Sequence, residues 1–163
     1  MPDYPVMFTV RDVVSGNGYL AGVTISGRAV MCQEDDGKWW VYGVRPGAIA
    51  DSGTTPQEAF HQFRDRYKTL LFDIADEAAD FEAFKNEVER FYTQEDSEEE
   101  NRWVAAFQEI RNGRVGIEAP FTALPKESPE KRPTGVSVLP LHQMKRFTAM
   151  DNIPDSYEFA AAA

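Results

Sequence analysis

Strand-like segments dominate the first third of the chain. Apolar, β-branched and aromatic residues cluster in short runs there, at residues 6–14, 19–25, 28–33 and 39–44. Asn17-Gly18 and Asp36-Gly37 separate consecutive runs, and Asn-Gly and Asp-Gly favour tight hairpin turns. Ser26-Gly27 is either a turn or a bulge within one long strand. The pattern predicts an antiparallel β-meander.

A helical period replaces the strand pattern after Thr55. Thr55-Pro56-Gln57-Glu58 is a capping box with proline at the first helical position. The apolar residues that follow recur at helical spacing: Ala59, Phe60, Phe63, Tyr67, Leu70, Leu71 and Ile74. We expect this helix to cover one face of the sheet.

Two further helices are predicted. One begins near Asp80, with Phe81, Phe84, Val88 and Phe91 on one stripe, and it is either separate from the first helix or continuous with it. The other follows an acidic segment that carries five carboxylates between residues 94 and 100. Ser97 and Glu100 form a second capping-box pattern there. This helix runs to about Arg111 and stops at Asn112-Gly113.

The remaining residues give weaker signals. Short strands are predicted over Val115–Phe121 and Val136–Leu141, with a proline-bearing loop at 125–133 between them. We expect the last residues, from Glu158, to be mobile. The fold class is α+β: an antiparallel β-meander packed against amphipathic helices, with a helical and irregular C-terminal extension. Residues 1–93 form the sheet-and-helix domain, and residues 94–163 pack on it.

The chain is strongly acidic. Its 163 residues include 27 acidic and 17 basic side chains, for a net charge of -10. Such a chain repels phosphate backbones and favours basic partners, so DNA is not an expected ligand. The sequence has neither a long apolar run nor a signal-peptide pattern, and we expect no membrane partner and a cytoplasmic location. The single cysteine, Cys32, excludes an internal disulfide.

Turn, strand and helix-cap signals follow one another between residues 19 and 75. Asp36-Gly37 is a first turn, Trp40-Val41-Tyr42 lies on an aromatic strand and Pro46-Gly47 is a second turn. Gly53-Thr54-Thr55 then leads to Glu58-Ala59 and the amphipathic helix. In this order of motifs, residues 19–75 resemble the HicB-like antitoxin family. The resemblance implies a partial ribonuclease H-like fold without the nuclease's acidic centre. It also implies a non-enzymatic role, in which the protein holds a small ribonuclease toxin inactive by occlusion.

The chain departs from the family pattern at its carboxyl end. Most family antitoxins carry a DNA-binding module there. In this chain residues 94–124 are net acidic, and few residues follow the strand predicted at 136–141, with Pro154 among them. A complete ribbon-helix-helix would be cramped in that length. This is a second reason not to expect DNA binding.

Three residues have side chains suited to catalysis. His61 lies in the first predicted helix between Glu58 and Asp65, and His142 follows the late strand. Cys32 lies in a strand-like run without a nucleophile signature, which is typical of a small buried residue. Metal-ligand spacings such as Cys-x-x-Cys are absent from the sequence. We therefore predict no catalytic residue, no metal and no cofactor. A self-assembling structural subunit and a small enzyme of unknown class are the alternatives.

The aromatic strand supplies the candidate contact residues. Side chains two apart share a face of a strand, so Trp40 pairs with Tyr42 and Trp39 with Val41. One pair faces the helix, and the other is free to contact a partner. The partner-binding candidates are Trp40 and Tyr42, with the acidic turn residues Asp35 and Asp36. We expect a basic protein partner, and homo-oligomers are also compatible with this sequence.

Overall fold

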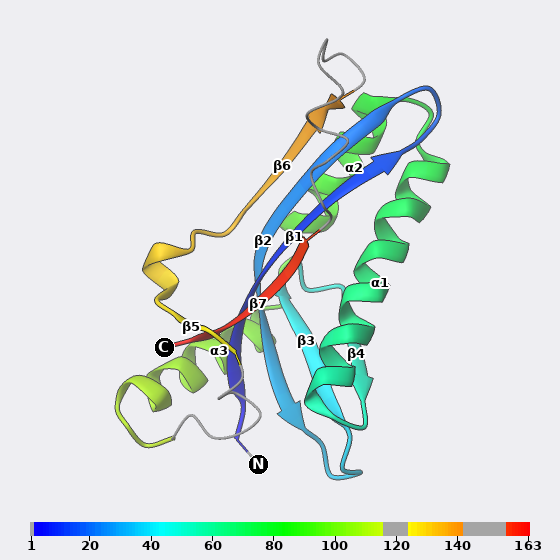
Figure 1. The fold of residues 1–163 in the computed structure, drawn as a ribbon. Coiled ribbons are helices and arrows are strands. Elements are labelled where there is room, and N and C mark those ends of the chain that lie inside the picture. The colour runs from blue at the N-terminus through cyan, green and yellow to red at the C-terminus, as the bar shows by residue number, and fades with distance from the viewer. Residues whose placement is uncertain (1, 116–123, 142–155) are drawn as a thin grey trace.

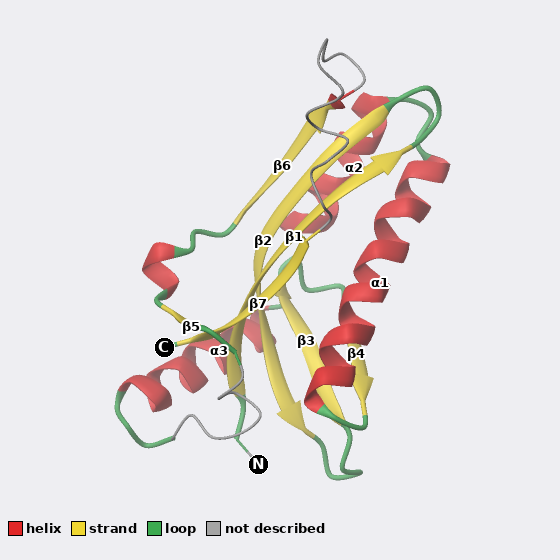
Figure 2. Cartoon of the chain, in the orientation of Figure 1, coloured by secondary structure: helices red, strands yellow, loops and turns green. Residues whose placement is uncertain are grey.

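One twisted sheet and three α-helices make up the part of the chain that the structure describes. The structure is a computed structural model that describes residues 2–115, 124–141 and 156–163. The strand order is β4-β3-β2-β1-β7-β5, and β6 pairs with β2 beside that path. Figure 1 shows α1 running alongside the long β1–β2 hairpin, and Figure 2 shows how strands and helices are distributed. The α+β class predicted from the sequence is confirmed.

The elements follow one another along the chain with short connections. The strands are β1 (Tyr4–Ser15), β2 (Leu20–Gln33), β3 (Trp39–Arg45), β4 (Ala50–Gly53), β5 (Lys126–Glu127), β6 (Gly135–Pro140) and β7 (Ser156–Ala162). The helices are α1 (Pro56–Glu77), α2 (Phe81–Thr93) and α3 (Ser97–Arg111), with a short 3-10 turn, η2 (Pro129–Lys131).

The first four strands form the predicted antiparallel meander. β2 runs through Ser26-Gly27 without a turn, and its register against β3 shifts between Arg28 and Ala29, so one long strand with an irregularity is the correct alternative. Different halves of β2 have different neighbours on the same edge. Residues 21–26 pair with β6, whereas residues 28–33 pair with β3. The late strand predicted near Val136 is therefore confirmed as β6.

α1 begins where the capping box places it. The Thr55 hydroxyl accepts a hydrogen bond from the Glu58 backbone N–H at 3.1 Å. The Glu58 carboxylate accepts from the Thr54 N–H at 2.6 Å, one residue before the cap. Both bonds satisfy donors that would otherwise be free at the helix start. The stripe that faces the sheet is buried: Ala59, Phe63, Tyr67, Leu71 and Ala75.

Aspartate caps start the other two helices. α2 is separate from α1, because the Asp80 carboxylate caps it by accepting from the Ala83 N–H at 2.8 Å. In α3 the cap is Asp96, which accepts from the N–H groups of Glu98 and Glu99 at 3.1 Å each. The predicted capping box at Ser97 is therefore wrong. The aspartate one residue earlier reaches the same free donors with a charged acceptor.

The two faces of the sheet carry different cores. The larger core lies under α1 and α2 and includes Phe8, Met31 and Val41 from the first three strands. The smaller core lies on the opposite face under α3, where Met7, Val30, Val44 and Trp103 meet, together with Ala160 and Ala162. The indole N–H of Trp103 donates to the Val6 carbonyl at 3.1 Å and ties α3 to the sheet.

The carboxyl end is a strand inside the sheet, so the expectation of a mobile end is wrong. β7 pairs antiparallel with β1 from Val6 to Arg11 and parallel with β5 on its other side. Phe159 lies against Phe60, with ring centroids 4.6 Å apart, in the larger core. Ala160, Ala161 and Ala162 are fully buried, so their small size allows close packing on both faces. Most of the strand predicted at Val115–Phe121 lies outside the described residues.

None of the described helices is long and apolar enough to cross a membrane.

Candidate binding surface

Trp40 and Tyr42 stack on one another on the face of the sheet that carries α3. Their ring centroids are 5.5 Å apart and the ring planes differ by 8°. The alternate residues, Trp39 and Val41, contact the core under α1 instead. Both stacked side chains are only partly buried. The β3 strand therefore holds two aromatic rings in a fixed orientation where they remain partly open to solvent.

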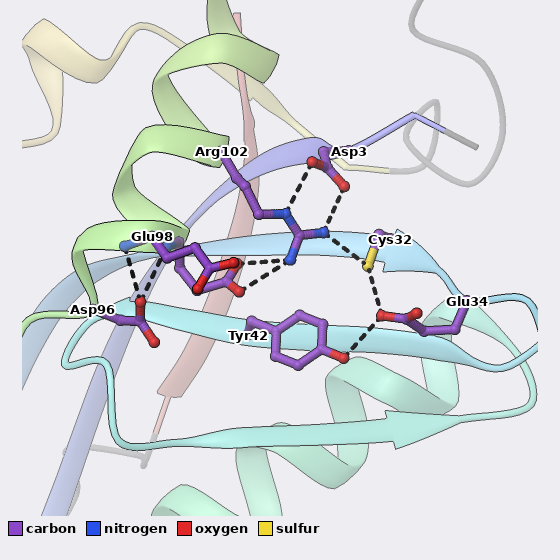
Figure 3. Close-up of polar contacts among 8 residues, drawn as sticks. Asp3, Cys32, Glu34, Tyr42, Asp96, Glu98 and Arg102 are labelled. Carbon is purple, nitrogen blue, oxygen red and sulfur yellow. Dashed lines mark hydrogen bonds and ion pairs between the residues drawn. The ribbon is translucent and has the colours of Figure 1, made fainter.

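Glu34 fixes the hydroxyl end of Tyr42 in the stacked Trp40–Tyr42 pair. The Tyr42 hydroxyl donates a hydrogen bond of 2.9 Å to the Glu34 carboxylate (Figure 3). Burial raises the pKa of Tyr42, and the bond and charge of Glu34 raise it further. The hydroxyl therefore stays protonated and keeps donating. This bond joins the end of β2 to β3 next to the hairpin turn.

Arg102 of α3 holds the inner side of the pair. Its guanidinium group lies 5.5 Å from the centre of the Tyr42 ring. The same group donates to Asp3 at 2.7 and 3.0 Å and to Glu99 at 3.0 Å (Figure 3). The hydrogen bonds to Asp3 are the main reason why the pKa of Arg102 is raised. Burial raises the pKa of Glu99, although Arg102 opposes that shift.

Cys32 lies between these groups and is 4% exposed. An Arg102 N–H points at its sulfur from 3.4 Å, and the sulfur is 3.7 Å from the Glu34 carboxylate. Burial raises the pKa of the Cys32 thiol, and the contacts with Arg102 oppose the shift. A raised pKa favours the neutral thiol, which is a poor nucleophile. The arrangement fits a buried structural cysteine.

The histidine that the structure describes, His61, gives Cys32 no base. His61 is exposed on α1, which covers the opposite face of the sheet, and it contacts Arg64 at 2.7 Å and Asp65 at 3.2 Å. This is a surface ion-pair arrangement of the kind that contributes little. His142 lies outside the described residues.

Asp35 and Asp36 occupy the turn that connects β2 to β3. Both are exposed, and the Asp36 carboxylate accepts from the Lys38 N–H at 2.9 Å. Gly37 has a φ of 82°, which suits glycine in this tight turn. The structure thus brings all four predicted contact residues to one hairpin, with the carboxylates at its tip and the aromatic rings behind them.

A second acidic segment borders the stacked pair at the start of α3. Residues 95–100 contribute five carboxylates. The Gly47 N–H donates to the Gln94 carbonyl at 2.6 Å, and the Asp96 N–H donates to the Val44 carbonyl at 3.0 Å. These bonds fix the acidic segment to the end of β3. Figure 3 shows Asp96 and Glu98 on the side of Tyr42 opposite to Glu34.

Elsewhere the surface offers an open groove between β4 and α1. It has a volume of about 360 Å³, and Asp51, Asp65, Arg66 and Asp73 are among its lining residues. Arg66 donates to Asp51 at 2.7 Å within it, and neither Cys32 nor His61 lines it. In the described part of the chain, no three His, Cys, Asp or Glu side chains converge as they would around a metal ion.

Sequence reasoning missed four residues of this surface: Asp3, Glu34, Glu99 and Arg102. The spacing of Glu99 and Arg102 on one helix is a detectable ion-pair signal. Nothing local connects Asp3 to Arg102, which follows it by 99 residues.

The fold and this surface define an α+β protein with an aromatic pair set between two acidic segments. Comparison of the chain with protein-family models, with curated proteins and with solved structures found no match. The resemblance of residues 19–75 to HicB-like antitoxins therefore stays a prediction.

Proposed function

We propose that this protein is a non-enzymatic binding protein that sequesters a basic protein partner by occlusion, as a HicB-like antitoxin does. By that resemblance the partner is a small ribonuclease toxin. The observation that carries the proposal is the stacked Trp40–Tyr42 pair between the acidic hairpin tip and the acidic start of α3.

Charge supports a basic partner. The chain has a net charge of -10, and both segments that border the aromatic pair are acidic. A surface on which acidic side chains outnumber basic ones raises the association rate of a basic protein and lowers that of an acidic one. The partner therefore presents lysine or arginine side chains to this face.

The aromatic rings support a stable complex rather than a passing encounter. Trp and Tyr are enriched among the residues that dominate binding energy, because they bury a large area at a low cost in side-chain entropy. Here the stack, the Glu34 bond and the Arg102 contact already fix the Tyr42 ring before any partner arrives. Less ordering is then needed on binding.

The test begins with capture from the native source. The tagged, nuclease-treated chain is analysed by native mass spectrometry together with the double variant Trp40→Ala/Tyr42→Ala. Phe72→Ala, a partly buried aromatic change on α1, is the matched control. We expect one small basic protein, in fixed stoichiometry, with the wild type and the control but not with the double variant.

The captured protein is then purified and assayed on RNA. We expect it to cleave RNA alone and to be inhibited by stoichiometric wild-type chain. Equal capture by the correctly folded double variant would contradict the proposed surface. A partner-free homo-oligomer would contradict the proposal and favour the assembly alternative.

A further inference from the structure

We infer that the ring of Trp40 is the binding site for an arginine side chain of the basic partner. The inference rests on the proposed function, since it names the chemical group that the partner presents to the surface. It follows from two observations: arginine side chains of this chain lie over its aromatic rings, and Trp40 stacks on a ring that already carries one of them.

Arginine over an aromatic ring recurs in this structure. Arg28 lies 4.2 Å from the Trp103 ring centre, Arg45 lies 5.0 Å from that of Tyr92, and Arg102 lies 5.5 Å from that of Tyr42. Trp40 is not among the rings that carry a cation in the described residues. Indole is the best of the aromatic side chains for this contact.

Arg102 shows the complete arrangement one ring away. Its guanidinium group lies against Tyr42 while its N–H groups donate to Asp3 and Glu99. A cation over an aromatic ring whose several N–H groups also donate to two carboxylates fits the fork of donors on guanidinium better than an ammonium group. Trp40 stacks on the same Tyr42 ring, and the two ring planes are nearly parallel.

The surroundings of Trp40 are negatively charged. Glu34, Asp35 and Asp36 are exposed at the end of the same hairpin. Lys38 precedes β3 and is also exposed near Trp40 in the chain, but the three carboxylates outweigh its single charge. A cation that approaches the open part of the indole therefore enters a favourable field, and charge complementarity selects a guanidinium group over a neutral planar group.

N-acetyl amides of single amino acids test this binding site without knowledge of the partner. The chain has three tryptophans, and only Trp40 is predicted to respond, so Trp39 and Trp103 are internal controls. N-acetyl-arginine amide is titrated into the full chain while the indole N–H signals are followed by NMR. The lysine analogue and the citrulline analogue, which is neutral but nearly the same shape, are titrated in parallel.

We expect a saturable shift of the Trp40 indole signal with the arginine probe and little shift at Trp39 and Trp103. The citrulline probe should bind about threefold to thirtyfold more weakly, since it lacks the cation. The affinity of the lysine probe should lie between those of the arginine and citrulline probes. Trp40→Phe has no indole signal at this position, so the backbone amide signals of the hairpin are followed instead in wild type and variant. The variant should bind the arginine probe more weakly while keeping its fold, which the rest of the spectrum verifies.

The results separate this inference from the proposed function. Equal shifts of the Trp40 signal with arginine and citrulline, or no shift at all, would contradict an arginine-binding site at Trp40. This holds even if capture of the basic protein still depends on Trp40. A Trp40 signal that responds selectively to arginine supports the binding site even if no partner is captured. In that case only the proposed sequestering function is contradicted.

Discussion

Arg102 and Asp3, which lie 99 positions apart, form an ion pair through two hydrogen bonds of 2.7 and 3.0 Å. The pair joins α3 to the chain just before β1 begins. Each side chain is about one-third exposed, at 30% and 31%. Arg102 also donates to Glu99 and lies over the Tyr42 ring. The contact therefore adds to the Trp103 bond that ties α3 to the sheet, and it connects α3 to the inner edge of the aromatic pair.

Arg102→Ala should therefore lower the free energy of unfolding by about 1–2 kcal/mol, more than a surface ion pair does. The reason is that Asp3 and Glu99 lose their shared partner in a partly buried place. Urea denaturation measures the loss. The control is Arg90→Ala, whose partner Glu87 lies on the same helix at 2.8 Å and whose side chain is 62% exposed. A loss no larger than that of the control would contradict the network.

Cys32 should react slowly with thiol reagents in the folded chain. It is 4% exposed, and burial raises the pKa of its thiol, so the reactive thiolate is scarce at neutral pH. We expect the reaction with a chromogenic disulfide at pH 8 to be at least about tenfold slower in the folded chain than in urea. Equal rates would instead reveal an accessible thiolate and would favour the enzyme alternative.

Phe159 should be a stabilising residue although it lies near the end of the chain. Its ring packs against Phe60 at 4.6 Å and against Phe63 at 6.3 Å. Phe159→Ala removes those contacts and should cost about 2–4 kcal/mol, near the range for a core phenylalanine. Thermal or urea unfolding measures the loss. Glu158→Ala, an exposed change on the same strand, is the control and should cost far less.

The contrast between β3 and β7 shows what the sequence could predict. β3 has a strong local signal, because aromatic and β-branched residues sit between an Asp-Gly turn and a Pro-Gly turn. β7 ends in a run of alanines, which carry no strand preference of their own. Its place is decided by pairing with β1 about 150 residues earlier and by the close packing of small side chains. Such tertiary effects leave no local pattern.

The residues of the candidate surface also differ in whether the sequence could predict them. The shared face of Trp40 and Tyr42 follows from the two-residue period of a strand, and the exposed Asp35 and Asp36 follow from the hairpin turn. The contact of Arg102 with the Tyr42 ring depends on how α3 crosses the sheet. Only a three-dimensional arrangement reveals that crossing.

Glu58 should make the stability of the chain depend on pH. Its hydrogen bonds from Thr54 hold the pKa of Glu58 below its usual value of 4.5. A lowered pKa in the folded state means that its contribution is present above the unfolded value and is lost as the pH falls through the folded value. The stability difference between wild type and Glu58→Gln should therefore shrink as the pH is lowered below 4.5.

Thr55→Ala is the matched control for that series, because the threonine hydroxyl caps the same helix without titrating in this range. Its cost should be about 1 kcal/mol. Urea denaturation between pH 7 and pH 3 measures both variants. A constant difference for Glu58→Gln across that range would contradict the assigned role of the carboxylate.

The acidic tip and the aromatic pair should affect different rate constants of partner binding. Asp35→Asn/Asp36→Asn removes two charges from the exposed hairpin turn, so it should slow association several-fold at low salt and little at high salt. Trp40→Ala/Tyr42→Ala removes the buried contact area, so it should raise the dissociation rate by about tenfold or more and leave association nearly unchanged. Surface plasmon resonance with the captured basic protein measures both constants.

Asp73→Asn/Asp76→Asn makes the same change in net charge on α1, on the opposite face of the sheet. Long-range steering by net charge alone would slow association equally with this control and with the hairpin variant. A larger effect at the hairpin would show that the partner approaches the end of β2 and β3. Equal effects, together with an unchanged dissociation rate in the aromatic variant, would move the binding face away from Trp40 and Tyr42 and leave only the general attraction between an acidic chain and a basic one.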